Sequence, residues 1–120
     1  MSKKTLVLGA SEKPHRFSNK AVRALEQAGH EVVAIGRREG KIGDIPIQTG
    51  FIPFEDIHTV TLYLNPGNQK DYYHYIFSLR PKRIIFNPGT ENLELEAMAT
   101  GLGIKILEQC TLVMLDEGLF

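Results

Sequence analysis

The chain has 120 residues, of which 42% are hydrophobic and 23% charged, a composition typical of one globular domain. Fourteen basic residues balance fourteen acidic ones, so net charge gives no reason to expect nucleic acid or a membrane as a partner. One cysteine excludes an internal disulfide framework, and no apolar run approaches the roughly 20 residues of a membrane helix or fits a signal peptide. We therefore expect residues 1–120 to form a single soluble domain in the cytoplasm.

Strand-like and helix-like patterns alternate along the chain. Helical spacing of apolar residues predicts helices at 18–28, 69–79 and 91–102, with a last short one from 111 to 115. Ser18 or Asn19 is expected to cap the first of these. The glycine- and proline-rich stretch 37–56 is read as irregular, with a short extended piece at 45–47 left open. Compact apolar runs predict buried strands at 5–8, 31–35, 59–64, 83–86 and 104–107.

The inner faces of two helices follow from the same spacing. In the second helix, Tyr72, Ile76 and Leu79 are expected to face inward, and the other residues of the Tyr72–Tyr75 run to lie at the surface, although such a run could also stack a nucleobase. In the third helix, the apolar positions in register are Leu95, Met98 and Leu102.

The alternation of strand and helix defines the expected fold class. Short connections between alternating elements predict right-handed crossovers, and hence a Rossmann-like three-layer α/β sandwich with a mostly parallel, five-stranded sheet. In such sheets, ligands bind at the carboxyl ends of the strands, near the point where the strand order reverses. Every predicted strand ends in a polar or glycine-bearing turn at that edge.

The loop between the first strand and the first helix is the first candidate site. Gly9 lets the backbone turn tightly, and the following helix N-terminus favours an anion. Neither a GxGxxG fingerprint nor a Walker A motif is present, so a plain strand-to-helix turn is the alternative. The residues that we expect to hold a phosphate are Gly9, Ala10, Ser11, Lys13, Arg16 and Ser18.

Two arginines after the second strand form the second candidate site. An acidic residue at this position usually holds the ribose hydroxyls of NAD, whereas arginine suits a phosphorylated ribose. Arg37 and Arg38 therefore indicate a ribose phosphate, the alternative being a solvated pair on the surface.

The residues LGAS-xx-PxRxSNxAxxxLxxAGHxVxxI, beginning at Leu8, resemble the small CoA-binding domain family. These proteins are stand-alone relatives of the N-terminal domain of the succinyl-CoA synthetase alpha subunit. The resemblance extends over nearly the whole chain, through the Asn87–Glu91 turn to Gly103-Ile104 and Cys110. It implies a Rossmann-like fold that binds coenzyme A or acyl-CoA.

The resemblance also implies roles for individual residues. Gly9 to Lys13 match the loop that holds the nucleotide phosphates, and Arg37 and Arg38 match the basic position that meets the ADP portion. Many relatives have a proline-containing turn where this chain has Gly36-Arg-Arg-Glu-Gly40, which leaves open which arginine contacts the ligand. The strand ends that line the rest of the groove are Asn65 and Pro66, and Asn87, Pro88 and Gly89.

No catalytic or metal-binding group can be argued from spacing. The four histidines do not have metal-ligand spacing, although His15 lies in the first loop and could touch a ligand. Cys110 is either a small buried residue or a thiol facing the thiol of CoA. We therefore expect non-catalytic binding of CoA. The alternatives are an NADP-dependent enzyme, a nucleotide-binding subunit of a larger enzyme, or a redox or interaction module. The acyl group, any protein partner and the oligomeric state stay open.

Overall fold

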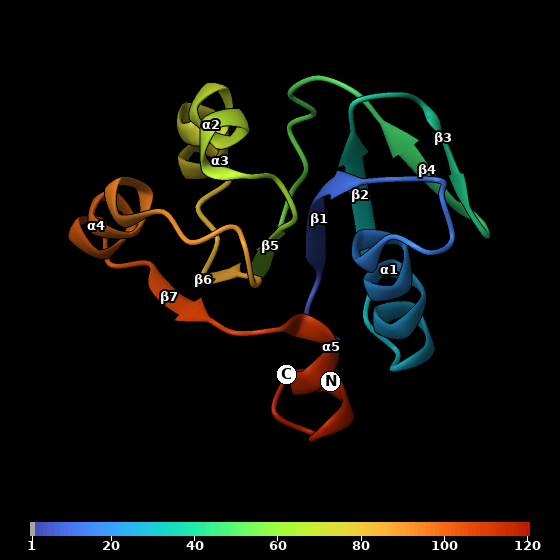
Figure 1. The fold of residues 1–120 in the computed structure, drawn as a ribbon. Coiled ribbons are helices and arrows are strands. Elements are labelled where there is room, and N and C mark those ends of the chain that lie inside the picture. Colours follow the sequence, from blue (N-terminus) through green and yellow to red (C-terminus); the bar gives the residue numbers. More distant parts are fainter. Residues whose placement is uncertain (1) are drawn as a thin grey trace.

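The structure, a computed structural model, describes residues 2–120 and is an α/β fold with one mixed, mostly parallel sheet (Figure 1). The sheet has seven strands in the order β3-β4-β2-β1-β5-β6-β7, and only the β3–β4 pair is antiparallel. The strands are β1 (Thr5–Ala10), β2 (Val32–Gly36), β3 (Gly40–Ile42), β4 (Ile45–Gln48), β5 (Thr59–Leu62), β6 (Arg83–Phe86) and β7 (Lys105–Glu108).

The expected count of five strands is wrong, because β3 and β4 form a short hairpin in the stretch read as irregular. The hairpin turns at Gly43, whose φ of +59° suits glycine, and Pro46 stands in β4 opposite Lys41. β4 also pairs in parallel with β2. With β3 left out, the strands numbered along the chain follow the order 3-2-1-4-5-6, which is that of the Rossmann sheet.

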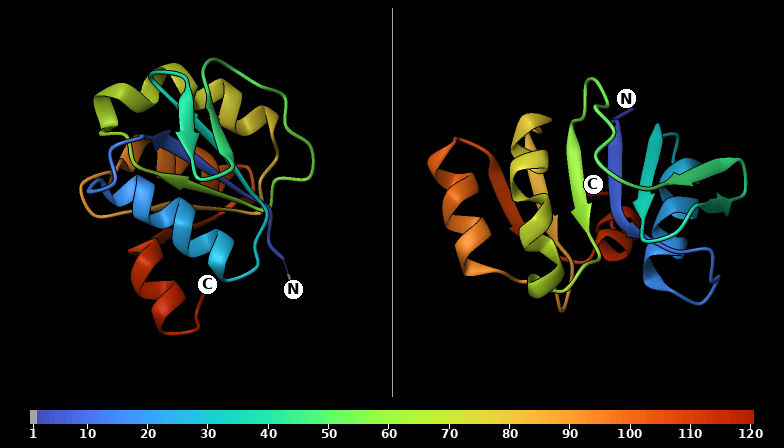
Figure 2. Two further views of the ribbon diagram at one scale, coloured as in Figure 1. Left: turned by 90° about the vertical axis from the view of Figure 1, so that its right-hand side faces the viewer. Right: turned by 90° about the horizontal axis from the view of Figure 1, so that it is seen from above.

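Helices cover both faces of the sheet (Figure 2). On one face, α1 and α5 pack over an apolar cluster that includes Val7, Val22 and Met114. On the other face, α3 and α4 pack over a cluster that includes Ile76 and Leu95. The helices are α1 (Phe17–Gln27), α2 (Pro66–Gln69), α3 (Tyr73–Ser78), α4 (Leu93–Gly101) and α5 (Thr111–Asp116), with a 3₁₀ helix η1 (Lys70–Tyr72) between α2 and α3.

Helix α1 begins one residue earlier than expected, and neither predicted cap serves as one. Arg16 is the N-cap residue and makes no side-chain capping bond. Ser18 and Asn19 lie buried inside the helix. Asn19 instead donates from Nδ2 to the carbonyl oxygen of Ser11 at 2.9 Å, which ties the preceding loop to the helix.

The single helix expected at 69–79 is three consecutive segments. Asn65 caps α2 by accepting a hydrogen bond from the backbone N–H of Asn68 at 3.0 Å, and Pro66 occupies a first-turn position that needs no N–H donor. Tyr75 is buried together with Ile76, contrary to the expected surface position, because it follows Tyr72 by three residues and so shares the inward face.

Helix α4 buries a narrower face than the apolar spacing predicted. Leu95 and Ala99 are fully buried, but Met98 is 43% exposed and Leu102 is 63% exposed, so their assignment to the inner face is wrong. Glu96 is buried instead, because its carboxylate accepts a hydrogen bond from the backbone N–H of Asn92 at 3.0 Å. No helix formed by residues 2–120 has the length and apolar character needed to cross a membrane.

Candidate functional site

The strand order reverses between β1 and β5, and a cavity lies at the carboxyl ends of the strands at this point. Its volume is about 160 Å³, which is less than the 300–1,000 Å³ of typical ligand pockets. It can therefore hold one group of a longer ligand that continues over the open edge. We call it the switch-point cavity, and it is lined by Gly9, Ile35, Gly36, Arg37, Leu64, Asn68, Asp71 and Tyr72.

Two glycines form the wall between β1 and β2. Gly9 has a φ of +103° and lies at an irregularity in the pairing of β1 with β2. A Cβ there would stand 2.9 Å from the carbonyl carbon of Tyr63. At Gly36 a Cβ would stand 2.9 Å from a methyl group of Ile47 and still closer to the carbonyl oxygen of Ala10. Both glycines are therefore required for strand packing, in addition to lining the cavity.

The loop between β1 and α1 is held from several sides. The backbone N–H of Lys13 donates to Oγ of Ser11 at 3.1 Å, and the backbone N–H of Arg16 donates to the carbonyl oxygen of Lys13 at 3.0 Å. On the far side of the loop, Oε2 of Glu12 accepts a hydrogen bond from the backbone N–H of Lys41 in β3 at 3.0 Å. The loop therefore has a fixed course, while the side chains of Lys13 and Arg16 stay exposed.

Of the two arginines after β2, Arg37 lines the switch-point cavity and Arg38 does not. Both side chains are exposed. Arg37 follows Gly36 at the end of β2, so it extends from the wall next to Gly9. The geometry thus brings Gly9 and Arg37 together and separates Arg38 from them.

The predicted strand-end residues mostly have structural partners. Asn65 and Pro66 start α2, as described above, and both are exposed. Asn87 is 2% exposed and holds three elements together: Nδ2 donates to Oγ1 of Thr61 at 2.7 Å and to the carbonyl oxygen of Leu62 at 2.8 Å, while Oδ1 accepts from the backbone N–H of Thr111 at 2.8 Å. The side chain of Asn87 is therefore engaged within the protein.

The remaining predicted residues differ in their exposure. Pro88 and Gly89 form the exposed turn after β6, where Gly89 has a φ of +93° and donates from its backbone N–H to Glu91 at 2.9 Å. Ala10 and Ser18 are buried, with 8% and 4% exposure, so their side chains do not reach the edge.

Sequence reasoning missed the cavity wall that follows β5. No sequence pattern marks Leu64, Asn68 or Asp71 as site residues, and Tyr72, which is expected to face inward, is half-buried and lines the cavity. The available signal was the start of α2 at Asn65-Pro66, because a helix that begins directly after the switch-point strand must present its first turns to this edge.

Cys110 and Tyr63 lie near each other on the α5 face of the sheet. Cys110 is half-buried and is the N-cap residue of α5. Burial raises the pKa of Tyr63 to about 12, and the neighbouring Thr111 and Thr61 hydroxyls offset only part of the rise. The Tyr63 hydroxyl has no partner with hydrogen-bond geometry among residues 2–120. Tyr63 is therefore neutral at physiological pH.

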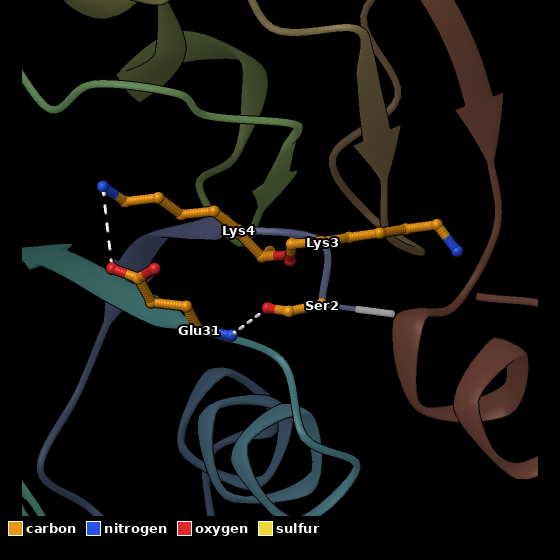
Figure 3. Close-up of polar contacts among 5 residues, drawn as sticks. Ser2, Lys3, Lys4 and Glu31 are labelled. Atoms are coloured by element: carbon orange, nitrogen blue, oxygen red, sulfur yellow. Dashed lines mark hydrogen bonds and ion pairs between the residues drawn. The ribbon is translucent and has the colours of Figure 1, made fainter.

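A larger cavity, of about 630 Å³, lies at the opposite edge, where the strands begin. Ser2, Lys4 and Glu31 belong to its wall: Oγ of Ser2 accepts from the backbone N–H of Glu31 at 2.9 Å, and Nζ of Lys4 lies 3.6 Å from the Glu31 carboxylate (Figure 3). We assign the candidate site to the smaller cavity, because doubly wound sheets bind ligands at the carboxyl edge. Within residues 2–120 no group of three or more His, Cys, Asp or Glu side chains could hold a metal ion.

Comparisons with known proteins agree with this architecture. The family model of the CoA binding domain matches residues 3–116. A crystal structure of an uncharacterized protein has 47% identity and a TM-score of 0.97, with 100% of this chain and 99% of that chain covered. A hypothetical protein from Pyrococcus horikoshii OT3 has 26% identity and a TM-score of 0.83, with 98% of this chain and 84% of that one covered. A comparison with curated proteins found no match.

A protein from Thermus thermophilus, solved as cell-free ID.343, shares the fold at 20% identity, with a TM-score of 0.86 and coverage of 99% of this chain and 91% of that one. The strand order, with the cavity at its switch point, defines a doubly wound α/β domain. The chain belongs to the CoA-binding domain family, because the family model spans 114 residues, from 3 to 116.

Proposed function

We propose that this protein binds coenzyme A or acyl-CoA at the carboxyl edge of its sheet and does not transform it. The observation that carries the proposal is the switch-point cavity, where the main chain at Gly9 and Gly36 meets the guanidinium-bearing Arg37. Membership of the CoA-binding domain family favours CoA among the nucleotides that such an edge could accept.

The pyrophosphate is assigned to the β1–α1 loop. Helix α1 has 11 residues and an N-cap without a side-chain bond, so its first-turn N–H groups and partial positive charge are available to an anion. Ser11 lies beside these groups, and the exposed Lys13 and Arg16 add positive charge. The bonds that Glu12 and Asn19 make to Lys41 and Ser11 hold the loop in place before a ligand arrives.

The ribose 3′-phosphate is assigned to Arg37. A guanidinium group matches phosphate geometry and keeps its charge at any physiological pH. Arg37 lies in the cavity wall, and its neighbour Arg38 contributes to the field from outside the cavity.

The pantetheine arm would then extend along the open edge toward the turns after β5 and β6. The exposed residues there are Asn65, Pro66, Pro88 and Gly89. Ala10, Ser18 and Asn87 support the edge from inside rather than through their side chains. We place the protein in the cytoplasm, with CoA as its partner and without nucleic acid or membrane as a partner, in keeping with its zero net charge.

The test compares CoA with NADP, which an enzyme of the alternative class would bind. A ligand that prefers the folded state raises the thermal midpoint, by an amount that grows with the logarithm of its concentration relative to its Kd. CoA should raise the midpoint and NADP should not. Native mass spectrometry of protein purified without added ligand should reveal the mass of CoA or of an acyl-CoA. A shift with NADP alone would reject the proposal in favour of the enzyme.

A further inference from the structure

An exposed aromatic ring stands beside the switch-point cavity and is held in a fixed position. Phe51 lies in the loop between β4 and β5, and its side chain is 59% exposed. Its ring centroid is nevertheless 5.4 Å from that of Tyr72, at an interplanar angle of 67°, and 5.5 Å from that of Tyr75. Such edge-on contacts are favourable beyond the area that they bury.

The loop that carries Phe51 is also anchored. The hydroxyl of Tyr75 donates to the carbonyl oxygen of Ile52, the next residue, at 2.5 Å. Ile52 and Phe54 pack against the core on the same side. The Phe51 ring thus faces solvent on a backbone that is fixed to α3, so a ligand that stacks on it would not have to order the loop first.

Tyr72 connects this aromatic surface to the cavity. It contacts Phe51 on one side and lines the cavity with Gly9 and Arg37 on the other. A planar ring that leaves the cavity would therefore meet the surface formed by Phe51 and Tyr72. We call these two residues the aromatic platform.

Two opposite charges line the same cavity. Arg37 and Asp71 are both exposed, and they form no ion pair, because the contact of Lys4 with Glu31 is the single ion pair within residues 2–120. An adenine nucleotide matches both charges at once: its phosphates accept hydrogen bonds from a guanidinium, and its 6-amino group donates to a carboxylate.

We propose that the aromatic platform of Phe51 and Tyr72 stacks the nucleobase of the ligand, and that Asp71 selects adenine by accepting a hydrogen bond from the 6-amino group. The inference rests on the proposed function, since CoA carries an adenine. It goes beyond that function by assigning base recognition to residues that no strand-end motif includes.

The test uses two fragments of CoA, with affinities measured by calorimetry: ADP, which carries the adenine and the pyrophosphate but not the 3′-phosphate, and 4′-phosphopantetheine, which carries the other arm. Alanine substitution of a ring that stacks a base costs about tenfold or more in affinity. Phe51→Ala should therefore weaken ADP and CoA by about tenfold or more and leave 4′-phosphopantetheine unchanged. Phe51→Tyr should bind ADP and CoA about as well as the wild type, because it keeps the aromatic ring. Leu93→Ala, on an exposed apolar residue of α4 outside the cavity, is the control.

The role of Asp71 is tested by the ratio of the affinities for ADP and IDP, which carries a carbonyl in place of the 6-amino group. The ratio cancels the effect that a removed negative charge has on the phosphates of both ligands. Asp71→Ala should bring the ratio toward one. Unchanged ADP affinity in Phe51→Ala, or no ADP binding by the wild type, overturns the inference. If the wild type binds ADP but neither CoA nor 4′-phosphopantetheine, the proposed function fails and the platform stands.

Discussion

The carboxylate of Glu12 accepts a hydrogen bond from the backbone N–H of Lys41 at 3.0 Å, and its side chain lies directly over Gly40. This contact joins the β1–α1 loop to the edge hairpin of β3 and β4. It spans 29 positions along the chain, and it gives the loop an external support that its own turns do not provide. The edge hairpin thus positions the proposed phosphate loop.

Removing this support should loosen the loop without unfolding the protein. Glu12→Ala deletes the acceptor at an exposed site, so we expect faster hydrogen exchange at the Lys41 amide and a loss of stability of about 1 kcal/mol or less. Mass spectrometry after deuterium labelling measures the first effect, and urea unfolding the second. Glu12→Gln keeps an acceptor oxygen, so the Lys41 amide should exchange more slowly in this variant than in Glu12→Ala. Equal protection in all three proteins would show that the bond does not hold the loop.

Gly9 should tolerate a side chain less well than another glycine with positive φ. Gly9→Ala places a Cβ 2.9 Å from the carbonyl carbon of Tyr63 and also strains the backbone. Gly43→Ala is the matched control, because its φ is +59° and a Cβ there meets no atom within 4 Å. Left-handed strain alone costs about 1–2 kcal/mol for a residue with a Cβ. In urea unfolding, Gly9→Ala should lower the free energy of unfolding by more than Gly43→Ala does. Equal losses would show that the close approach to Tyr63 adds nothing to the backbone strain.

The fold class followed from the sequence because its signals are local. Buried parallel strands are apolar throughout and end in glycine or polar turns, as at Gly9 and Gly36. The hairpin of β3 and β4 was not predicted, because strands of three and four residues are too short to show an alternating pattern and because Pro46 argues against a strand. Its stability comes from pairing with β2, which no local pattern records.

Only those residues of the candidate site that lie at the end of a predicted strand could be predicted from the sequence. Arg37 and Gly9 were found because they end strands of the predicted sheet. Tyr72, by contrast, shares one helical face with the buried Tyr75 and Ile76, and only the tertiary structure shows that its end of this face borders the cavity. Phe51 contacts Tyr72 and Tyr75, which lie more than 20 positions further along the chain. No periodic pattern in a sequence predicts contacts between residues so far apart.

Asn87 should matter more for stability than for ligand binding. Its amide joins Thr61, Leu62 and Thr111, and Asn87→Ala would remove the partner of the Leu62 carbonyl and of the Thr111 N–H, while the Thr61 hydroxyl keeps its bond to Oγ1 of Thr111 at 2.7 Å. Each unsatisfied buried group costs about 1–3 kcal/mol, so for two such groups we expect a loss of roughly 2 kcal/mol or more in urea unfolding. Asn68→Ala, on an exposed residue, should change stability by about 0.5 kcal/mol or less. A small loss for Asn87→Ala would mean that water replaces the amide.

Two histidines at the amino edge should make the fold sensitive to acid. Burial lowers the pKa of His30 and of His58 below the ordinary value of 6.5, and the nearby positive charges of Lys3 and Arg83 lower both further. His30 also accepts a hydrogen bond at Nδ1 from the backbone N–H of Lys3 at 3.0 Å, which a protonated ring cannot do.

The sign of the effect follows from proton binding. Since the folded state resists protonation, the unfolded state binds more protons below pH 6.5, and stability falls as the pH drops through this range. Above pH 6.5 the stability contributed by the neutral His30 ring is fully present. Urea unfolding at several pH values between 5 and 8 should show a shallower decline for His30→Gln than for the wild type. Parallel curves would show that His30 does not contribute.

The two arginines after β2 should differ in how they affect the ribose 3′-phosphate. CoA and dephospho-CoA differ only in this group, and a hydrogen bond to a charged group contributes about 1.5–3 kcal/mol, which is about tenfold or more in affinity. The wild type should prefer CoA by at least that factor. Because Arg37 lines the switch-point cavity and Arg38 does not, Arg37→Ala should lose most of the preference while binding dephospho-CoA nearly as before. Arg38→Ala is the matched control and should keep the preference.

Calorimetry at two salt concentrations completes the test of the arginines. Both side chains are exposed, so added salt should reduce the wild-type preference by screening. If Arg37→Ala weakens both ligands equally, Arg37 contacts the pyrophosphate instead of the 3′-phosphate. If Arg38→Ala loses the preference and Arg37→Ala keeps it, the nucleotide runs outside the cavity wall, and its placement against Gly9 and Gly36 is wrong. If neither variant changes either affinity, both arginines are solvated surface charges and the ribose phosphate lies elsewhere on the edge.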